Sequence, residues 1–232
     1  MSAVAGVLFD KDGTLFDFRA TWEAWAQSFL IRLGQGDRAR AAALGRVIGF
    51  DFESPGFAPD SIVIAGTPGE IVATLLPHLP GQDPAGLLAM LNEEAALAPQ
   101  AEAVPLRPFL AGLRADGLRL GVATNDAEAP ARAHLDGAGI TGLFDFIAGF
   151  DSGHGAKPGP GQMLAFAKAC GLNPEAVVMV GDSTHDLHAG RAAGMRCAAV
   201  LTGLAPRAVL APLADVVLPD ISALPEWIAS LG

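Results

Sequence analysis

Several short apolar runs in this sequence each lead into a polar side chain, and this pattern constrains the fold more than any other feature. The first run spans residues 6–9 and ends at Asp10. Unbroken apolar runs of this length are typical of strands buried on both faces of a parallel sheet. Helical patterns alternate with the later runs, and such alternation predicts an α/β fold. We therefore expect a doubly wound, Rossmann-like parallel sheet as the core.

The strands of this sheet are expected at residues 6–10, 118–124, 146–149, 176–181, 195–201 and 216–218, with helices at 106–115, 128–138, 162–170 and 186–193. The long stretch between the first two strands is mostly helical. Thr21 is expected to N-cap its first helix, and Pro68 and Pro84 stand where proline is favoured, at the first position of a helix. We predict a core domain from residues 1–16 and 101–232 and a helical insertion of residues 17–100 above the sheet.

Composition narrows the partners and the compartment. A chain of 232 residues that is 51% hydrophobic can bury a substantial core. Its net charge of −10 disfavours nucleic acid and anionic lipid as partners. Two cysteines, Cys170 and Cys197, form no disulfide framework, and no segment is typical of a signal peptide or a membrane span. The sequence predicts a cytoplasmic protein without a membrane partner, and it leaves open a monomer or a homodimer.

Polar side chains gather at the expected carboxyl ends of the strands, where ligands bind in open parallel sheets. They are Asp10 and Asp12, Thr124 and Asn125, Lys157, and Asp182 and Asp186. Several carboxylates in one crevice need a cation to stay ionised, and oxygen ligands favour Mg²⁺. A lysine and a hydroxyl suit phosphate oxygens. The set therefore predicts a magnesium site that also binds a phosphoryl group.

The spacing of the first two aspartates predicts a division of labour between them. Asp12 lies two residues beyond Asp10, so both can face one site, and Gly13 allows a sharp turn there. One carboxylate of the set can attack phosphorus, and Asp12 is placed to protonate the leaving oxygen and later to deprotonate water. An isolated Asp-x-Asp is usually a loop motif. The same ordinary interpretation applies to each of the other motifs alone, but it does not account for all of them at successive strand ends.

These motifs resemble those of the haloacid dehalogenase superfamily, and most closely its phosphoglycolate phosphatase-like branch. The matching segments are 10–15, Thr124-Asn125, Lys157-Pro158 and 181–186, and they cover the predicted core. The resemblance implies a nucleophile and metal ligand at Asp10. It implies further roles, residue by residue: acid–base catalysis and a carbonyl metal ligand at Asp12, phosphoryl binding at Thr124 and at the Asn125 backbone, charge neutralisation at Lys157, and metal binding at Asp182 and Asp186. It also implies that the insertion is a helical cap domain that opens and closes about hinges near Asp17 and Ala103.

Departures from the family pattern refine the expected chemistry. Dehalogenases of the superfamily lack the second aspartate, so Asp12 favours phosphate chemistry. Phosphonoacetaldehyde hydrolases need a lysine in the cap, and this chain has none between Lys11 and Lys157. Lys11 itself is unusual in the first motif, and it either adds positive potential on the cap side of the site or is an ordinary surface residue.

The cap is expected to choose the substrate. An acidic substrate such as phosphoglycolate would need one of its arginines to face inward, although a solvated helix face is the more common place for each. These candidates are Arg19, Arg32, Arg38, Arg40 and Arg46. Trp22 and Trp25 are expected to pack within the cap, and His185 and His188 are not needed as metal ligands because the carboxylates suffice.

Three alternatives to a small-molecule phosphate monoester hydrolase stay open. A phosphomutase of the β-phosphoglucomutase type shares the motifs but returns the phosphoryl group to a sugar. A phosphorylation switch such as a response-regulator receiver also combines carboxylates, a threonine and a lysine, but it is shorter and its acceptor follows a middle strand. A non-catalytic sensor of a phosphorylated metabolite would keep the scaffold without the reaction.

Overall fold

The computed structural model describes residues 3–231 and contains the predicted doubly wound α/β core. A six-stranded, wholly parallel sheet has the order β5-β4-β1-β6-β7-β8. Its strands are β1 (Gly6–Phe9), β4 (Arg119–Ala123), β5 (Phe146–Ala148), β6 (Val177–Gly181), β7 (Arg196–Val200) and β8 (Val216–Leu218). The chain winds outward from β1 in one direction and then in the other, so the switch point lies beside the strand that leads into Asp10.

Side-chain alternation along the strands places helices on both faces of the sheet. Val7 and Phe9 of β1 contact one hydrophobic cluster and Leu8 the opposite one, as the two-residue period of a strand requires. The first cluster packs against α5 (Leu106–Ala115), α6 (Glu128–Gly137) and α10 (Leu224–Ala229). The second packs against α7 (Gly161–Cys170), α8 (Thr184–Ala192) and α9 (Arg207–Leu210). Both faces are therefore covered, and the two cysteines, Cys170 and Cys197, stay unpaired thiols.

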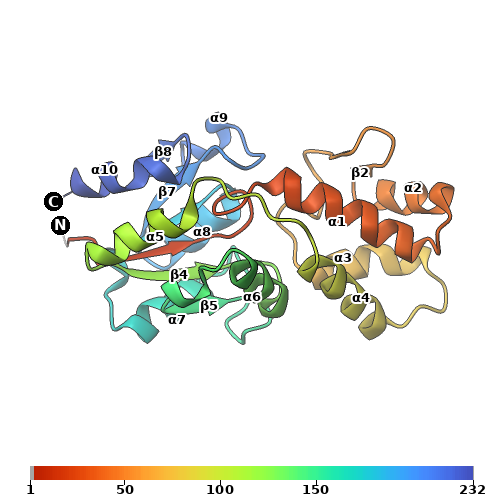
Figure 1. Ribbon diagram of the computed structural model, residues 1–232, viewed down its shortest axis with the longest axis horizontal. Helices are drawn as coiled ribbons and strands as arrows, with labels where there is room; N and C mark the ends of the chain where they lie inside the picture. The colour runs from red at the N-terminus through yellow and green to blue at the C-terminus, as the bar shows by residue number, and fades with distance from the viewer. Residues whose placement is uncertain (1–2, 232) are drawn as a thin grey trace.

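The helices between β1 and α5 lie beyond one end of the sheet, at the right of Figure 1, and the described ends of the chain lie at the other end. We call residues 17–100 the cap segment. Its elements are α1 (Phe18–Leu33), α2 (Arg38–Val47), α3 (Pro68–Leu75), α4 (Pro84–Ala96) and the short strands β2 (Phe50–Asp51) and β3 (Gly56–Phe57). Four single turns of 3-10 helix complete the described chain, at Leu76–His78, Thr141–Leu143, Pro174–Ala176 and Ile221–Ala223.

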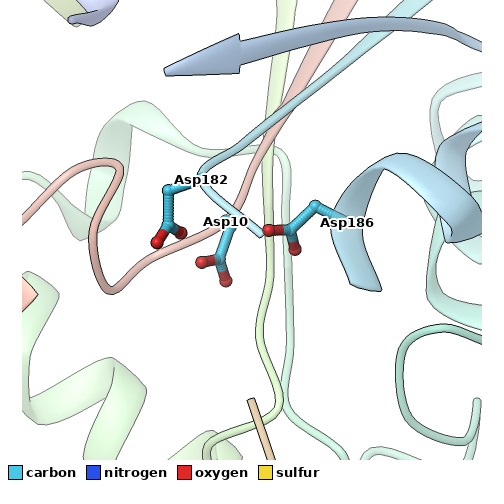
Figure 2. A group of neighbouring side chains, drawn as sticks. All are labelled: Asp10, Asp182 and Asp186. Atoms are coloured by element: carbon cyan, nitrogen blue, oxygen red, sulfur yellow. The ribbon is translucent and has the colours of Figure 1, made fainter. Parts of the chain in front are cut away.

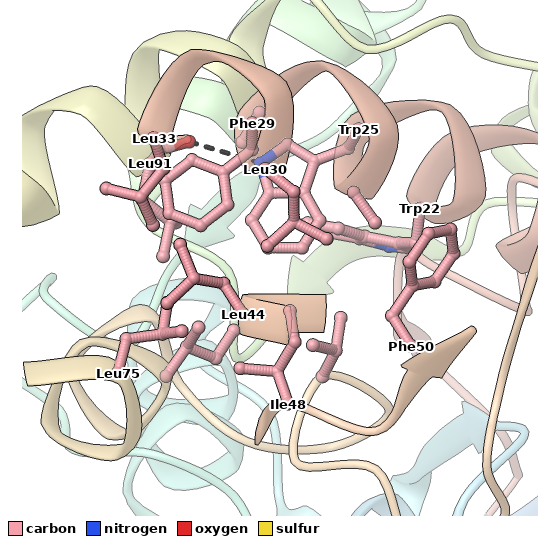
Figure 3. Close-up of a cluster of buried hydrophobic side chains, with 14 of the residues drawn as sticks. Trp22, Trp25, Phe29, Leu30, Leu33, Leu44, Ile48, Phe50, Leu75 and Leu91 are labelled. Atoms are coloured by element: carbon pink, nitrogen blue, oxygen red, sulfur yellow. Dashed lines mark hydrogen bonds between the residues drawn. The ribbon is translucent and has the colours of Figure 1, made fainter. Parts of the chain in front are cut away.

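The cap segment buries a hydrophobic cluster of its own, drawn from residues between Phe18 and Ala98 (Figure 3). The ring of Trp25 stacks on that of Phe29 at 5.0 Å, and its indole N–H donates to the carbonyl oxygen of Leu91 at 3.3 Å. Aromatic packing of this kind adds about 0.5–1.5 kcal/mol per pair to the burial of the rings. The exact division of the chain into two domains at residues 17 and 100 stays a prediction.

Two backbone segments connect the cap segment to the sheet, and they pair with each other. The amide of Asp17 donates to the carbonyl of Ala101 at 2.8 Å, and the amide of Ala103 donates to that of Leu15 at 2.9 Å. These pairs lie where the hinges are predicted. Among residues 3–231, no helix combines the length and the apolar character needed to cross a bilayer.

The ends of several cap elements differ from the expectation. The prediction that Thr21 is the N-cap of α1 is wrong. Asp17 caps this helix by accepting a hydrogen bond from the amide of Ala20 at 2.8 Å, and Thr21 lies inside the helix. Both are capping residue types, so the sequence alone did not separate them. The stretch expected to be mostly helical also contains a short hairpin of β2 and β3. Pro68 and Pro84 are confirmed at the starts of α3 and α4.

Candidate active site

The register of the central strands brings three sequence motifs to one edge of the sheet. Phe9 at the end of β1 lies opposite Val122 of β4 on one side and Val180 of β6 on the other. The residues that follow these positions, Asp10, Thr124 and Asp182, therefore emerge together at the carboxyl ends of adjacent strands. All three are buried, although they are polar.

Carboxylates from two strand ends and one helix converge at this edge (Figure 2). Asp10, Asp182 and Asp186 each offer an oxygen within 4.8 Å of the others. The ammonium of Lys157 lies between two of them, with Nζ 2.5 Å from Asp10 Oδ1 and 2.6 Å from Asp186 Oδ1. The four side chains thus form one buried charge cluster.

The cluster has more carboxylate groups than ammonium groups. Burial raises the pKa of Asp10 to about 7, despite the opposing effect of Lys157, and burial together with Asp10 raises the pKa of Asp182 well above its ordinary value. Burial would lower the pKa of Lys157, but Asp10 and Asp186 outweigh it, so this pKa is raised and the ammonium stays protonated. Three close carboxylates with one ammonium are a set that a further cation would stabilise.

Asp186 is held in place by the start of α8. Ser183 caps the helix, its amide donating to Asp186 Oδ2 at 3.0 Å and its hydroxyl to the same oxygen at 2.7 Å. This capping box uses Oδ2 and leaves Oδ1 to Lys157. Gly13 has a φ of 78°, and a Cβ atom there would collide with the carboxylate of Asp182. A glycine is therefore required beside this carboxylate.

Asn125 holds the backbone of Lys157 rather than standing free in the site. Its Oδ1 accepts from the Lys157 amide at 2.8 Å, and its Nδ2 donates to the Lys157 carbonyl at 2.9 Å. Nδ2 also donates to the carbonyl of Ala65 in the cap segment at 2.8 Å. The Thr124 hydroxyl accepts from the amide of Asp126 at 3.1 Å, which leaves its own O–H group able to donate. The fully buried Gln162 donates a hydrogen bond from Nε2 to the Thr124 carbonyl at 3.1 Å.

Lys11 is fully buried and is not the surface residue that one sequence interpretation allowed. Its Nζ lies 2.7 Å from either carboxylate oxygen of Asp12, 3.4 Å from Asp126 Oδ2 and 2.9 Å from His134 Nδ1. Asp12 and Asp126 raise the pKa of Lys11 against the opposing effect of burial. Burial raises the pKa of Asp126 to about 6. The Lys11 charge is therefore matched by carboxylates, and the carboxylate of Asp12 contacts Lys11 without being part of the Asp10–Asp182–Asp186 group.

A cavity of about 50 Å³ lies between this edge of the sheet and the cap segment. Its core side includes the carboxylates of Asp10, Asp12, Asp126 and Asp182, together with Thr124, Asn125, Lys157, Ser183 and His185. Its cap side carries the apolar side chains of Phe18, Trp22, Val63, Ile64, Ile71 and Leu91. The predicted site residues are thus brought together, except that Asp186 lies behind Lys157 and outside the cavity lining.

The cap arginines do not reach this cavity in the described structure. Arg19 pairs with Glu23, Arg32 pairs with Glu93 and Glu94, and Arg38 lies over the ring of Phe52. Arg40 and Arg46 are exposed. Trp22 and Trp25 both pack in the hydrophobic cluster of the cap as expected, and Trp22 also lines the cavity, as does His185.

The residues present fit a hard divalent cation. The donors are all carboxylate oxygens, they are buried, and they carry more negative charge than Lys157 offsets. This is the ligand chemistry that Mg²⁺ selects. Asp10 and Asp182, with Asp186 beside them, would hold the ion. The backbone carbonyl of Asp12, expected as a further ligand, stays a prediction.

Sequence reasoning missed Asp126, His134 and Gln162. Asp126 follows the Thr124-Asn125 motif directly, so a third polar residue after a strand was its available signal. His134 and Gln162 lie on helices α6 and α7 and are buried. A single polar residue on a helix has no spacing that marks it, so only the tertiary contacts reveal these two.

The comparisons with known proteins agree with this geometry. The family model of the haloacid dehalogenase-like hydrolases matches residues 4–194 of this chain. A phosphoglycolate phosphatase from Cereibacter sphaeroides is 33% identical over 205 residues, covering 85% of each chain. One from Rhodospirillum rubrum is 34% identical over 120 residues, which span about half of each chain, 52% of this one and 50% of the relative.

A solved structure gives the same fold. CbbY from Rhodobacter sphaeroides, crystallised in complex with phosphate, superimposes with a TM-score of 0.70 at 24% identity, over 95% of this chain and 96% of that one. Identity at this level shows the fold alone. The family match and the Cereibacter sphaeroides relative, which is 33% identical, show that the chain belongs to the haloacid dehalogenase-like hydrolase family, as an enzyme of its phosphoglycolate phosphatase-like branch.

Proposed function

We propose that this enzyme is a Mg²⁺-dependent phosphatase that hydrolyses a small-molecule phosphate monoester through an aspartyl-phosphate at Asp10. The observation that carries the proposal is the contact of Lys157 Nζ with both Asp10 and Asp186 beside the carboxylate of Asp182. A buried carboxylate with a lysine in contact and excess negative charge around it suits attack on phosphorus once a cation is bound. The bound ion would supply charge neutralisation for the phosphoryl oxygens.

The first half of the proposed reaction transfers the phosphoryl group to the enzyme. A carboxylate oxygen of Asp10 forms a bond to phosphorus, and the bond from phosphorus to the ester oxygen breaks. Asp12 gives its proton to that leaving oxygen, so the alcohol departs neutral. Lys157 and the Thr124 hydroxyl stabilise the phosphoryl oxygens, and Asn125 keeps the Lys157 backbone in position.

The second half returns the enzyme to its starting state. Water attacks phosphorus, Asp12 takes the proton from that water, and the bond between Asp10 and phosphorus breaks to release inorganic phosphate. General acid–base help of this kind typically contributes ~10²–10⁴ in rate. Asp12 is suited to it because its carboxylate lines the cavity and is not part of the Asp10–Asp182–Asp186 group.

Lys11 acts in this proposal as a positioning residue for Asp12. Its ammonium contacts both oxygens of that carboxylate from a fully buried position, and Asp126 and His134 hold the ammonium in turn. Hydrogen bonds that connect the cap segment to this machinery include those from Asn125 to the Ala65 carbonyl and from His134 to the Ala95 carbonyl. We propose that residues 17–100 form a cap domain whose opening admits the substrate.

Inorganic phosphate release from a panel of small phosphate esters tests the proposal. Release should require Mg²⁺, stop in EDTA and be abolished in Asp10→Asn. The alcohol should be recovered free, because a phosphomutase of the β-phosphoglucomutase type would instead keep the phosphate on an organic product. Absence of phosphate release from every ester by the folded, Mg²⁺-loaded protein would contradict the proposal and favour a mutase or a sensor.

A further inference from the structure

Because the cap wall of the catalytic cavity carries no cation in the described structure, we infer that this enzyme acts on the phosphate monoester of a small, uncharged alcohol and discriminates against phosphoglycolate. The inference rests on the proposed phosphatase function and concerns the part of the substrate that remains after the phosphoryl group is removed. It differs from what the names of the relatives would suggest for this chain.

The charge around the cavity is the first argument. Four carboxylates line its core side, from Asp10, Asp12, Asp126 and Asp182. The lining ammonium, Lys157, already contacts Asp10 and Asp186, and Lys11 lies behind the lining in contact with Asp12 and Asp126. Mg²⁺ held by Asp10 and Asp182 would offset their charge, and Lys11 is already matched by Asp12 and Asp126, so the core side offers no unused cation to a second anionic group on the substrate.

The cap side of the cavity supplies no positive charge for a second anionic group of the substrate either. Its lining side chains are apolar, and the five cap arginines are either exposed or paired away from the cavity. His185, which also lines the cavity, belongs to the first turn of α8 on the core side. A carboxylate buried against these apolar side chains would lose its hydration without gaining a partner, which is unfavourable, whereas the burial of a methyl or methylene group there is favourable.

The cap wall does offer one neutral polar group. Trp22 lines the cavity and is only 7% exposed, and its indole Nε1 has no hydrogen-bond partner within residues 3–231. Buried donors are rarely left unpaired in native proteins, so one without a protein partner beside a cavity indicates that a ligand atom accepts from it. A single N–H donor among apolar side chains suits a hydroxyl or carbonyl oxygen on a short carbon chain.

The size of the cavity limits the alcohol. The space of about 50 Å³ accommodates only a few water molecules, so in this arrangement of the cap it is smaller than a complete phosphate ester. A short hydroxyalkyl phosphate therefore requires a smaller displacement of the cap from the sheet than a sugar phosphate does.

A matched series of three esters tests this inference by initial rates of phosphate release with Mg²⁺: phosphoglycolate, n-propyl phosphate and 3-hydroxypropyl phosphate. We expect kcat/KM for both propyl esters to exceed that for phosphoglycolate by roughly 10-fold or more, the cost of one unpaired buried charge or polar group. The 3-hydroxypropyl ester should exceed n-propyl phosphate by about 5-fold, the contribution of one hydrogen bond.

Two variants connect the preference to the cap wall. Ile64 lies on the cap loop and is half-buried, so Ile64→Arg places a guanidinium at the cavity without burying it completely. This variant should raise kcat/KM for phosphoglycolate relative to n-propyl phosphate by roughly 10-fold, whereas the uncharged control Ile64→Gln should not. Trp22→Phe keeps an aromatic ring and should remove the advantage of the hydroxyl group alone.

The outcomes distinguish a wrong substrate class from a wrong phosphatase function. Faster hydrolysis of phosphoglycolate than of the propyl esters by the unmodified enzyme would overturn the substrate class and leave the phosphatase intact. An unchanged ester ratio in Ile64→Arg would equally overturn the role given to the cap wall. Failure to hydrolyse any ester, including p-nitrophenyl phosphate, would overturn the proposed function and this inference with it.

Discussion

Lys11 Nζ lies 2.9 Å from His134 Nδ1, although 123 positions separate the two residues in the chain. An ammonium can only donate, so Nδ1 must accept and the ring proton must reside on Nε2. Nε2 then donates to the carbonyl of Ala95 at 2.6 Å, on helix α4 of the cap segment. One neutral histidine thus connects the lysine beside Asp12 to the cap.

The protonation of His134 predicts a specific loss of stability in acid. Burial, with the nearby charge of Lys11, lowers the pKa of His134 to about 4, whereas in the unfolded chain it is ~6.5. Because the histidine pKa is lower in the folded protein, its contribution to folding stability is fully present at a pH above the pKa of the unfolded chain. This contribution is lost as the pH falls from ~6.5 toward ~4. Between pH 7 and pH 5 the contribution is on the order of 2 kcal/mol.

Urea unfolding of the intact chain and of His134→Gln at both pH values measures this effect. The variant should be less stable at pH 7 but should lose less of its free energy of unfolding on going to pH 5. Equal losses in the two proteins would show that His134 is not held neutral by its surroundings.

Replacing Lys11 should affect proton transfer to the leaving group more than phosphoryl binding. Lys11→Met removes the group that contacts both oxygens of Asp12. An alkyl phosphate needs a proton on its poor leaving oxygen, whereas p-nitrophenyl phosphate does not. We expect kcat to fall roughly 10-fold or more for the alkyl ester and much less for the nitrophenyl ester.

The chain offers a matched control for this test, because Lys168 is an exposed lysine on α7. Lys168→Met should leave both rates unchanged. An equal fall for the two esters in Lys11→Met would indicate general damage to the site instead of mispositioning of Asp12, and unchanged activity with unchanged Michaelis constants would rule out any role for Lys11.

Metal binding should be visible in thermal stability without any assay of activity. Mg²⁺ that binds only the folded protein raises its stability by mass action. We expect a rise in Tm with Mg²⁺ for the unmodified chain and little or none for Asp182→Asn, which loses one of the three clustered carboxylates.

In EDTA, Asp182→Asn should be about as stable as the unmodified chain, or more stable. The pKa of Asp182 is raised because its charge is buried near Asp10 and Asp186, so removing that charge should cost the metal-free protein little stability or even increase it. The same Tm shift with Mg²⁺ in both proteins would show that the ion binds elsewhere.

Much of the fold and of the site is predictable from the sequence because it depends on local patterns. Apolar runs that end in Asp10, Thr124 and Asp182 identified the central strands, and parallel pairing then brought their ends together. Two candidate N-cap residues that lie four positions apart, such as Asp17 and Thr21, are not separated by local pattern. The short hairpin of β2 and β3 has too few residues to show a period.

The missing parts of the site are those that only tertiary contacts create. The burial of Lys11, its contact with His134 and the unpaired N–H of Trp22 depend on how α1, α4 and α6 pack against one another. Likewise, five cap arginines were possible substrate ligands from the sequence, and the structure places none of them at the cavity. Side-chain direction at helix ends and in loops is not encoded by spacing alone.

The central claim is that Asp10 becomes covalently phosphorylated, and chemical trapping tests it most directly. The enzyme is mixed with Mg²⁺ and a phosphate ester, quenched in acid within the first turnover and reduced with borohydride. Reduction converts an aspartyl-phosphate into homoserine, which peptide mass spectrometry locates. We expect homoserine at position 10 alone, and none after omission of the ester. Substrate turnover without modification of Asp10, or with modification at another carboxylate, would contradict it.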